Sequence, residues 1–157
     1  MKAAFVAIAL ALMSMPAHAG FNPVEFFRGK THGDGVLKII FQSSKTIRVD
    51  SEGYPEKDGS LVLKQTIHEP EKAPRVRYWR MRQTGPDRFD GTLTDADGPV
   101  RVDVVGERLR IRYHGKDKLN FDQWLTPQAN GEVRNSMSVK RLGFTVARFE
   151  ETIRKAD

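Results

Sequence analysis

The stretch that decides the fold class is RLRIRY, at residues 108–113. Apolar side chains alternate with arginines at every second position, which is the period of an extended strand and not of a helix. One face of such a strand is expected to be buried, and the basic face is expected to meet solvent. The apolar positions are Leu109, Ile111 and Tyr113, and the basic positions are Arg108, Arg110 and Arg112.

Less strict runs with the same period fill the rest of the chain, separated by turn residues such as Asp58-Gly59 and Asn130-Gly131. They predict about ten antiparallel strands joined by hairpins. Because an open sheet would expose two edges, we expect closure into an all-β, up-and-down, lipocalin-like barrel. The last run could also be drawn as a helix end, and we assign it to the closing strand. The expected strands lie at residues 37–42, 46–50, 61–68, 75–82, 88–94, 100–105, 108–113, 120–125, 132–139 and 144–154.

A short helix is expected before the first strand. Asn22 can cap it, Pro23 suits its first turn, and Phe21 can pack on Phe26. The glycine-rich stretch 29–35 then ends the helix, and we expect it to form the turn into the first strand.

The first residues are typical of a secretory signal peptide, with a charge at Lys2, an apolar run over 3–13 and small residues ending at Ala19. The apolar run is shorter than the roughly 20 residues that cross a bilayer. We expect cleavage after Ala19, which leaves residues 20–157 as a single barrel domain in the periplasm.

The composition narrows the classes of partner. The 157-residue chain has a formal net charge of +6, of which Lys2 contributes one, so the exported part carries +5. In an exported protein this basicity indicates solubility and attraction to anionic membrane surfaces, and no nucleic acid is expected. The absence of cysteine excludes disulfides, thiolate metal ligands and a cysteine nucleophile. We expect a monomer.

Familiar chemical motifs are missing or incomplete. Gly29-Lys30-Thr31 ends like a phosphate-binding loop, but Val24 stands where that loop needs its first glycine. The histidines of the exported part, His32, His68 and His114, are too far apart to suggest a metal site. No serine lies in a G-x-S-x-G frame. We therefore expect no metal, no cofactor and no hydrolase triad.

Four aspartates could in principle supply an acid and base pair. Asp95 and Asp97 lie in an evident turn, which they are expected to cap, and nothing in the sequence places Asp103 and Asp122 together. The sequence leaves open whether Asp95 and Asp122 are functional or structural.

Cations and aromatic residues are mixed at 75–82. In a strand, Arg77 and Trp79 share one face, and Tyr78 and Arg80 share the other. The simpler interpretation places Trp79 in the core with Arg77 beside it. The alternative is that this pair binds an anionic headgroup or stacks on a flat ligand.

Two later positions are also candidates. Trp124 shares a strand face with Asp122, and Asn135 shares one with Val133 and Met137. A polar group among apolar neighbours is either hydrogen-bonded into the barrel wall or turned toward a cavity. The sequence does not separate these two cases.

The order of several short motifs resembles a bacterial family of exported proteins catalogued as domain of unknown function 3833. The resemblance covers nearly the whole exported part. It implies a lipocalin-like barrel and a connection with lipids, but no activity. Many members look like lipoproteins with a cysteine at the cleavage site, where this chain has Gly20, so we expect it to be free of a lipid anchor. The matching residues are Phe27, Gly29, Thr31, Gly33 and Gly35; Arg77 and Trp79; Phe89, Gly91, Thr92, Asp95 and Gly98; Asp122 and Trp124; Asn135, Arg141 and Gly143; and Arg154 and Lys155.

Three functions follow as hypotheses. The first is a periplasmic barrel that binds a hydrophobic or amphipathic small molecule, such as a fatty acid or lipid. The second is a filled, non-catalytic scaffold whose basic face at 108–112 contacts a partner or an anionic membrane. The third is a lipid-acting enzyme, which would need an interior polar cluster with perturbed pKa values. The candidate ligand-binding residues are Arg77, Trp79, Tyr113, Trp124, Asn135 and Met137, and the glycines, Thr31, Thr92 and the aspartates of the motifs are assigned structural roles.

Overall fold

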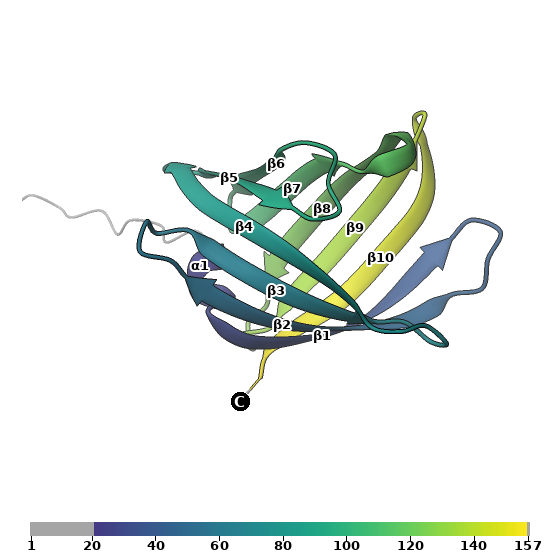
Figure 1. Ribbon diagram of the computed structural model, residues 1–157, viewed down its shortest axis with the longest axis horizontal. Helices are drawn as coiled ribbons and strands as arrows, with labels where there is room; N and C mark the ends of the chain where they lie inside the picture. The colour runs from purple at the N-terminus through teal and green to yellow at the C-terminus, as the bar shows by residue number, and fades with distance from the viewer. Residues whose placement is uncertain (1–20, 157) are drawn as a thin grey trace, which may run out of the picture.

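A computed structural model describes residues 21–156, so the predicted signal peptide at 1–19 lies outside the described residues. One short helix precedes ten strands, which form a single closed barrel (Figure 1). None of the helices among the described residues is long and apolar enough to cross a membrane. The elements are α1 (Pro23–Phe26), β1 (Gly29–Ile39), β2 (Lys45–Pro55), β3 (Leu61–His68), β4 (Arg75–Gly85), β5 (Arg88–Leu93), β6 (Val100–Val105), β7 (Arg108–His114), the 3-10 turn η1 (Lys116–Lys118), β8 (Leu119–Pro127), β9 (Val133–Arg141) and β10 (Phe144–Lys155).

The topology is an antiparallel meander that closes on itself. Each strand pairs with its neighbours in sequence, and β1 also pairs with β10, with Gly33 opposite Ile153. The predicted fold class, an all-β up-and-down barrel with a short N-terminal helix, is confirmed. The barrel has two distinct ends. We call the end that carries α1 the helix end, and the end formed by the β1–β2, β3–β4, β5–β6, β7–β8 and β9–β10 connections the mouth.

Helix α1 is built as the sequence predicts. The Asn22 side chain accepts a hydrogen bond from the Val24 amide at 2.9 Å, and the Phe21 and Phe26 rings lie 5.4 Å apart. The helix directs Phe27, which is 5% exposed, into the barrel core. The N-terminal segment therefore covers one end of the barrel.

The prediction of a turn at 29–35 was wrong, because these residues are the first seven of β1. Only Gly29 has a positive φ, of +79°. Gly33 and Gly35 are needed for space. A methyl group at Gly33 would overlap the Glu151 carboxyl, and one at Gly35 would lie 2.6 Å from the Phe149 ring. The glycines let side chains of β10 lie against β1.

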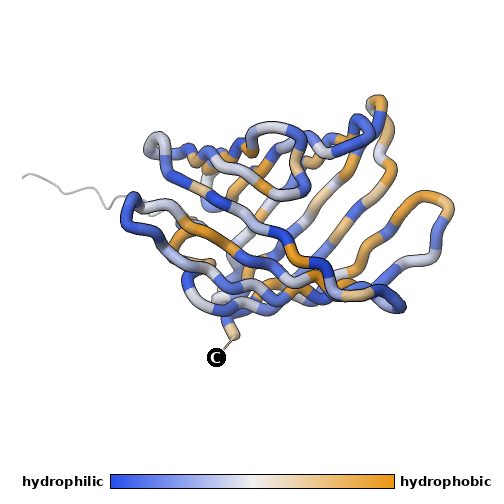
Figure 2. Tube along the Cα trace, viewed as in Figure 1, coloured by the Kyte–Doolittle hydropathy of each residue, from blue (hydrophilic) through white to orange (hydrophobic). Residues whose placement is uncertain are grey.

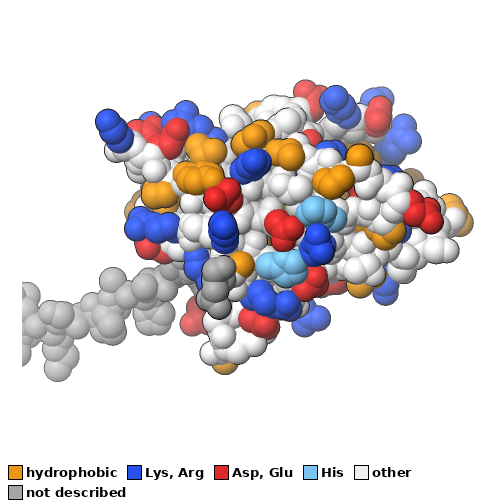
Figure 3. All heavy atoms as spheres, turned by 60° about the horizontal axis from the view of Figure 1, so that its bottom comes forward, with side chains coloured by type: hydrophobic (Ala, Val, Ile, Leu, Met, Phe, Trp, Pro, Cys, Tyr) orange, Lys and Arg blue, Asp and Glu red, His pale blue; other side chains and the backbone are white. Residues whose placement is uncertain are grey.

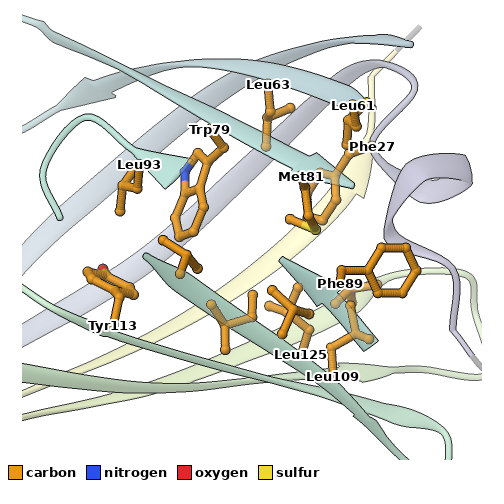
Figure 4. Packing of buried hydrophobic residues seen from close by; sticks show 14 of the residues in the cluster. Phe27, Leu61, Leu63, Trp79, Met81, Phe89, Leu93, Leu109, Tyr113 and Leu125 are labelled. Atoms are coloured by element: carbon orange, nitrogen blue, oxygen red, sulfur yellow. The ribbon is translucent and has the colours of Figure 1, made fainter. Parts of the chain in front are cut away.

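Buried apolar residues form two separate clusters. The larger one, which we call the core cluster, fills the helix end and extends across the barrel (Figure 4). The smaller one, which we call the mouth cluster, lies nearer the mouth on β1, β2, β3, β9 and β10. The core cluster comprises Phe27, Leu61, Leu63, Trp79, Met81, Phe89, Leu93, Val100, Val102, Leu109, Ile111, Tyr113, Leu125, Val133 and Ile153; the mouth cluster comprises Ile47, Val49, Ile67 and Phe149, with Leu37 and Met137 partly buried against them.

The packing of α1 against β2 can be tested at Gly53. We expect Gly53→Ala to lower the free energy of unfolding by about 2–3 kcal/mol, because the added methyl would overlap the backbone carbonyl of Phe27. Gly85→Ala is the matched control: its methyl would meet its nearest atom at 3.8 Å, and a change within about 0.5 kcal/mol is expected. Urea unfolding followed by circular dichroism measures both. Equal stabilities would contradict the close approach of α1.

Candidate functional site: a polar belt inside the barrel

Polar side chains point inward at the level between the two apolar clusters. On β3, Gln65 lies between Leu63 of the core cluster and Ile67 of the mouth cluster. Period-two alternation places Glu151 in the same way between Phe149 and Ile153 on β10. A layer of polar groups therefore separates two apolar regions. We call this layer the polar belt; it consists of Thr31, Ser51, Gln65, Arg77, Gln123, Asn135 and Glu151.

Gln65 organises one side of the polar belt. Its amide donates to the Ser51 hydroxyl at 3.1 Å, and its oxygen accepts from Arg77 Nε at 2.8 Å and from the Trp79 indole at 2.6 Å. The Arg77 guanidinium also lies over the Trp79 ring, 5.4 Å from its centroid. These contacts hold Arg77 and Trp79 in fixed positions inside the barrel.

Asn135 and Glu151 occupy the β9–β10 side of the polar belt. Asn135 Nδ2 donates to Glu151 Oε2 at 2.7 Å, across a register in which the two residues are directly paired. Two buried oxygens, Asn135 Oδ1 and Thr31 Oγ1, have no hydrogen-bond partner among the described residues. Because buried polar atoms are normally paired, both oxygens are available to a water molecule or a ligand.

Burial controls the electrostatics of the polar belt. Desolvation raises the pKa of Glu151, although the hydrogen bond from Asn135 and the field of Arg77 oppose this effect. Desolvation also lowers the pKa of Arg77 and raises that of Tyr113. Arg77 and Glu151 influence each other, yet they form no ion pair within 4.0 Å in the described chain. Glu151 is therefore not the close counter-ion of Arg77.

On the mouth side, a carboxylate compensates the charge of Arg77 only in part. Asp95 Oδ2 lies 3.8 Å from Arg77 Nη1, but the same oxygen lies 2.5 Å from Arg75. Tyr113 contacts the Trp79 ring edge to face, with centroids 5.8 Å apart, and stacks on Phe121 at 4.5 Å. Arg77 therefore sits between an aromatic wall and a carboxylate that already has another partner.

Five of the six candidate ligand-binding residues lie inside the barrel. The structure brings Arg77, Trp79 and Tyr113 together on one side and Asn135 and Met137 together on the other. Trp79 is 5% exposed with Arg77 beside it, which confirms the simpler interpretation of this pair. Asn135 is hydrogen-bonded into the wall through one atom and left unpaired at the other.

Trp124 does not line the interior, and this part of the prediction was wrong. Its neighbours Gln123 and Leu125 point inward, so Trp124 is on the outer face. There it is covered by the guanidinium groups of Arg108 and Arg110, 4.3 and 5.2 Å from its ring centroid. The two arginines are on the outer face, as the strand pattern predicted, and Arg108 is exposed.

The outer basic face of β7 is largely neutralised. Arg110 makes two hydrogen bonds to Asp122, at 3.0 and 2.7 Å, and Arg112 Nη2 lies 2.6 Å from Asp103. The bond to Arg110 lowers the pKa of Asp122, which stays ionised. Asp122 therefore holds the outer wall together, and the basic face at 108–112 offers less free charge than its sequence indicates.

Other residues of the short motifs have structural contacts. Gly91 allows close approach of the Arg80 carbonyl, and Gly98 and Gly143 have positive φ values of +104° and +83°. Thr92 lies on the exposed face of β5, opposite Arg80.

The outer wall formed by β1, β2 and β3 carries paired charges. His32 and His68 both hydrogen-bond to Asp50, at 2.7 and 3.0 Å, and histidines lie among acidic and basic side chains on the face in Figure 3. Within residues 21–156, no group of three or more histidine or carboxylate side chains is arranged to hold a metal ion. A surface hollow of about 760 Å³ lies on the β5–β9 wall beside Arg101, Arg112 and Lys140.

The sequence interpretation missed Glu151, Gln65, Gln123 and Ser51 as interior residues. Each one occupies an inward position in a strand with period two, as Gln65 does between Leu63 and Ile67. Applying the alternation to polar as well as apolar residues would have found them.

A model of a protein family described as "Protein of unknown function (DUF3833)" matches residues 13–155. The comparison with curated proteins gives no match. Among solved structures, the S-type phycobiliprotein lyase CPES from Guillardia theta superposes with a TM-score of 0.69 at 6% identity, covering 85% of this chain and 90% of that one. A structure of EF1p2_mFAP2b bound to DFHBI has a TM-score of 0.45 at 10% identity, covering 85% and 96%. The first of these similarities shows a shared fold.

The buried carboxyl of Glu151 makes folding pH-dependent. Because folding raises its pKa, the unfolded chain loses this proton first, and stability falls as pH rises from the ordinary value of 4.5 through the raised one. We expect Glu151→Gln, which can keep the bond from Asn135, to stabilise the protein at pH 8 by about 1–2 kcal/mol and to leave it nearly unchanged at pH 4. Urea unfolding at the two pH values measures this.

Glu150→Gln is the control, because the Glu150 side chain is 52% exposed on the outer face. It should change stability little at either pH. A loss of stability at pH 8 for Glu151→Gln would instead show that an ionised Glu151 is needed for the fold.

Proposed function

The chain belongs to the DUF3833 family of proteins of unknown function, and from that premise we propose that it is a barrel that binds an amphipathic small molecule. The ligand class is a fatty acid or a lipid with an anionic head. One observation carries the proposal: Arg77 is a largely buried member of the polar belt, and among the described residues its only carboxylate within 4.0 Å, Asp95, is shared with Arg75. A buried cation of this kind is stabilised by an anion that binds beside it.

The polar belt supplies further contacts for a ligand head. The unpaired Asn135 Oδ1 can accept a hydrogen bond, and Glu151, when protonated, can donate one. Thr31 Oγ1 can do either. A head with both donor and acceptor atoms would therefore satisfy groups that the fold alone leaves unpaired.

The mouth cluster supports an apolar tail. Ile47, Val49, Ile67 and Phe149 are buried on the mouth side of the polar belt, with Leu37 and Met137 only partly buried against them. A tail along this surface would bury the parts of Leu37 and Met137 that are still exposed. Burial of apolar surface contributes about 25 cal/mol of binding free energy per Å². The head of the ligand would then lie at the polar belt, and its tail would extend toward the mouth.

We further propose that the protein is exported to the periplasm and that residues 1–19 are removed there. The support is the sequence pattern that ends at Ala19. Amino-terminal sequencing of protein from the periplasmic fraction should begin at Gly20. Protein that starts at Met1 in the cytoplasmic fraction would contradict this part of the proposal.

A lipid-acting enzyme is the second candidate, because the polar belt contains groups with shifted pKa values, as that hypothesis requires. The hydrogen bonds made by the two hydroxyl groups of the polar belt favour binding over catalysis, because neither group is prepared to act as a nucleophile. Ser51 bonds only to Gln65, and Thr31 is unpaired, so among the described residues neither hydroxyl of the polar belt is activated by a base.

Binding can be followed by intrinsic fluorescence, since the chain has 2 tryptophans. Trp124→Phe leaves Trp79 as the interior reporter, and Trp79→Phe leaves only the outer Trp124. We expect palmitate to change Trp79 emission saturably at a 1:1 ratio and to leave Trp124 emission unchanged. Native mass spectrometry of detergent-free protein should detect the same adduct. If Trp79 does not respond and no adduct forms, the barrel is a filled scaffold.

The role of Arg77 is tested by comparing palmitate with hexadecanol, which has the same tail without the charge. We expect Arg77→Gln to weaken palmitate binding by about 10- to 100-fold and hexadecanol binding much less. Arg110→Gln, on the outer wall, should affect neither ligand. If the wild-type protein bound the two ligands with equal affinity, the proposal that the ligand has an anionic head would be wrong. This comparison does not depend on whether the variant folds.

A further inference from the structure

Two hairpins at the mouth expose large apolar side chains. At the β1–β2 turn, Ile40 is 48% exposed and Phe41 is fully exposed. At the β9–β10 turn, Leu142 is 71% exposed and Phe144 is 77% exposed. The β1–β2 hairpin is the long hydrophobic stretch that projects at the right of Figure 2. We call these two turns the mouth hairpins; they comprise residues 40–44 and 142–144.

The backbone at these turns is unfavourable for the residues that occupy it. Phe41 has a φ of 60° and Leu142 a φ of 49°, in the left-handed region that bulky side chains rarely adopt. Leu142 and Gly143 form a two-residue turn with positive φ at both positions, where asparagine followed by glycine is favoured. The hairpins thus accept backbone strain and apolar exposure at the same residues. Strain of this kind accumulates at functional sites.

The two mouth hairpins belong to neighbouring strand pairs. Strand β1 pairs with β10, and the Ile40 amide donates to the Val146 carbonyl at 3.0 Å, just before the β1–β2 turn. Both turns project from the same end of the barrel (Figure 1). They can therefore contact one surface together.

The two strand segments that carry the mouth hairpins contain only positive charges, although Glu71 of the β3–β4 turn lines the same surface hollow as Lys45. Residues 36–49 and 136–149 contain no aspartate or glutamate. They contain six lysines and arginines, five of which form no ion pair within 4.0 Å with any described residue; Arg48, paired with Asp50, is the exception. The five unpaired cations are Lys38, Lys45, Lys140, Arg141 and Arg148. This contrasts with β7, where Arg110 and Arg112 are neutralised by carboxylates.

We infer that the mouth hairpins dock on the surface of an anionic phospholipid bilayer. Phe41, Leu142 and Phe144 would enter the interfacial region, where apolar and aromatic side chains are stabilised, and the five cations would meet the phosphate groups. The mouth then faces the bilayer. This inference does not rest on the proposed function, because vesicle binding can occur whether or not the barrel holds a ligand.

A second copy of the chain is the competing occupant of this surface. Two copies joined through the mouth hairpins would bring ten unpaired cations together, since each copy contributes the same five. Like charges at an interface are strongly unfavourable. An anionic surface satisfies both the apolar side chains and the charges, so the positive charge favours the bilayer.

The test uses residues 20–157 and vesicle flotation. We expect the wild-type protein to float with vesicles that mix phosphatidylglycerol with phosphatidylcholine, to stay unbound with pure phosphatidylcholine, and to lose binding as salt is raised. The double variant Phe41→Asn, Leu142→Asn should bind at least about tenfold more weakly. It should also melt at an equal or higher temperature, because asparagine relieves the strain at both positions.

Val105→Asn is the matched control. Val105 is 44% exposed at the helix end, so its replacement should leave vesicle binding unchanged. Failure of the wild-type protein to bind anionic vesicles, or equal binding by the double variant, would overturn the inference. A dimer seen by analytical ultracentrifugation that the double variant abolishes, without vesicle binding, would assign the surface to self-association.

Discussion

The pairing of β1 with β10 is the contact on which the rest of the structure depends. It joins residues that are more than a hundred positions apart, such as Gly33 and Ile153, and it removes both sheet edges. The pairing brings Glu151 and Phe149 toward the interior beside β1, where Gly33 and Gly35 leave room for them. The polar belt and the mouth cluster each depend on this closure, because each uses side chains from both sides of the seam.

The sequence predicts the barrel because alternation is a local property. Leu109, Ile111 and Tyr113 all point inward, as their spacing indicates. It fails at 29–35, because glycine reads as a turn residue when the reason for it, the Glu151 side chain, lies far away in the chain. The prediction that Trp124 lines the interior fails for a related reason. Its size suggests burial in the barrel, but two arginines cover it on the outer face. Polar interior residues can be predicted only if the period-two alternation is given more weight than the polarity of the residue.

The interior combines features that an efficient scaffold would avoid. A buried cation at Arg77 and a buried carboxyl at Glu151 contribute little to stability unless they are closely paired, and they are not. The two apolar clusters could have been continuous if Gln65, Asn135 and Glu151 were aliphatic. Their polarity is the physical basis of the proposal that a ligand binds at the polar belt.

The even number of strands determines how the connectivity of the chain could be changed. With ten antiparallel strands, β1 begins and β10 ends at the helix end, and the Ala156 amide donates to the Lys30 carbonyl at 3.0 Å. A short linker could therefore join the two ends, and the chain could be cut at a hairpin instead, as in a circular permutation. The barrel is in this sense a ring with no preferred starting strand. A fusion partner attached at the carboxyl end would lie at the end of the barrel opposite the mouth and leave the mouth hairpins uncovered.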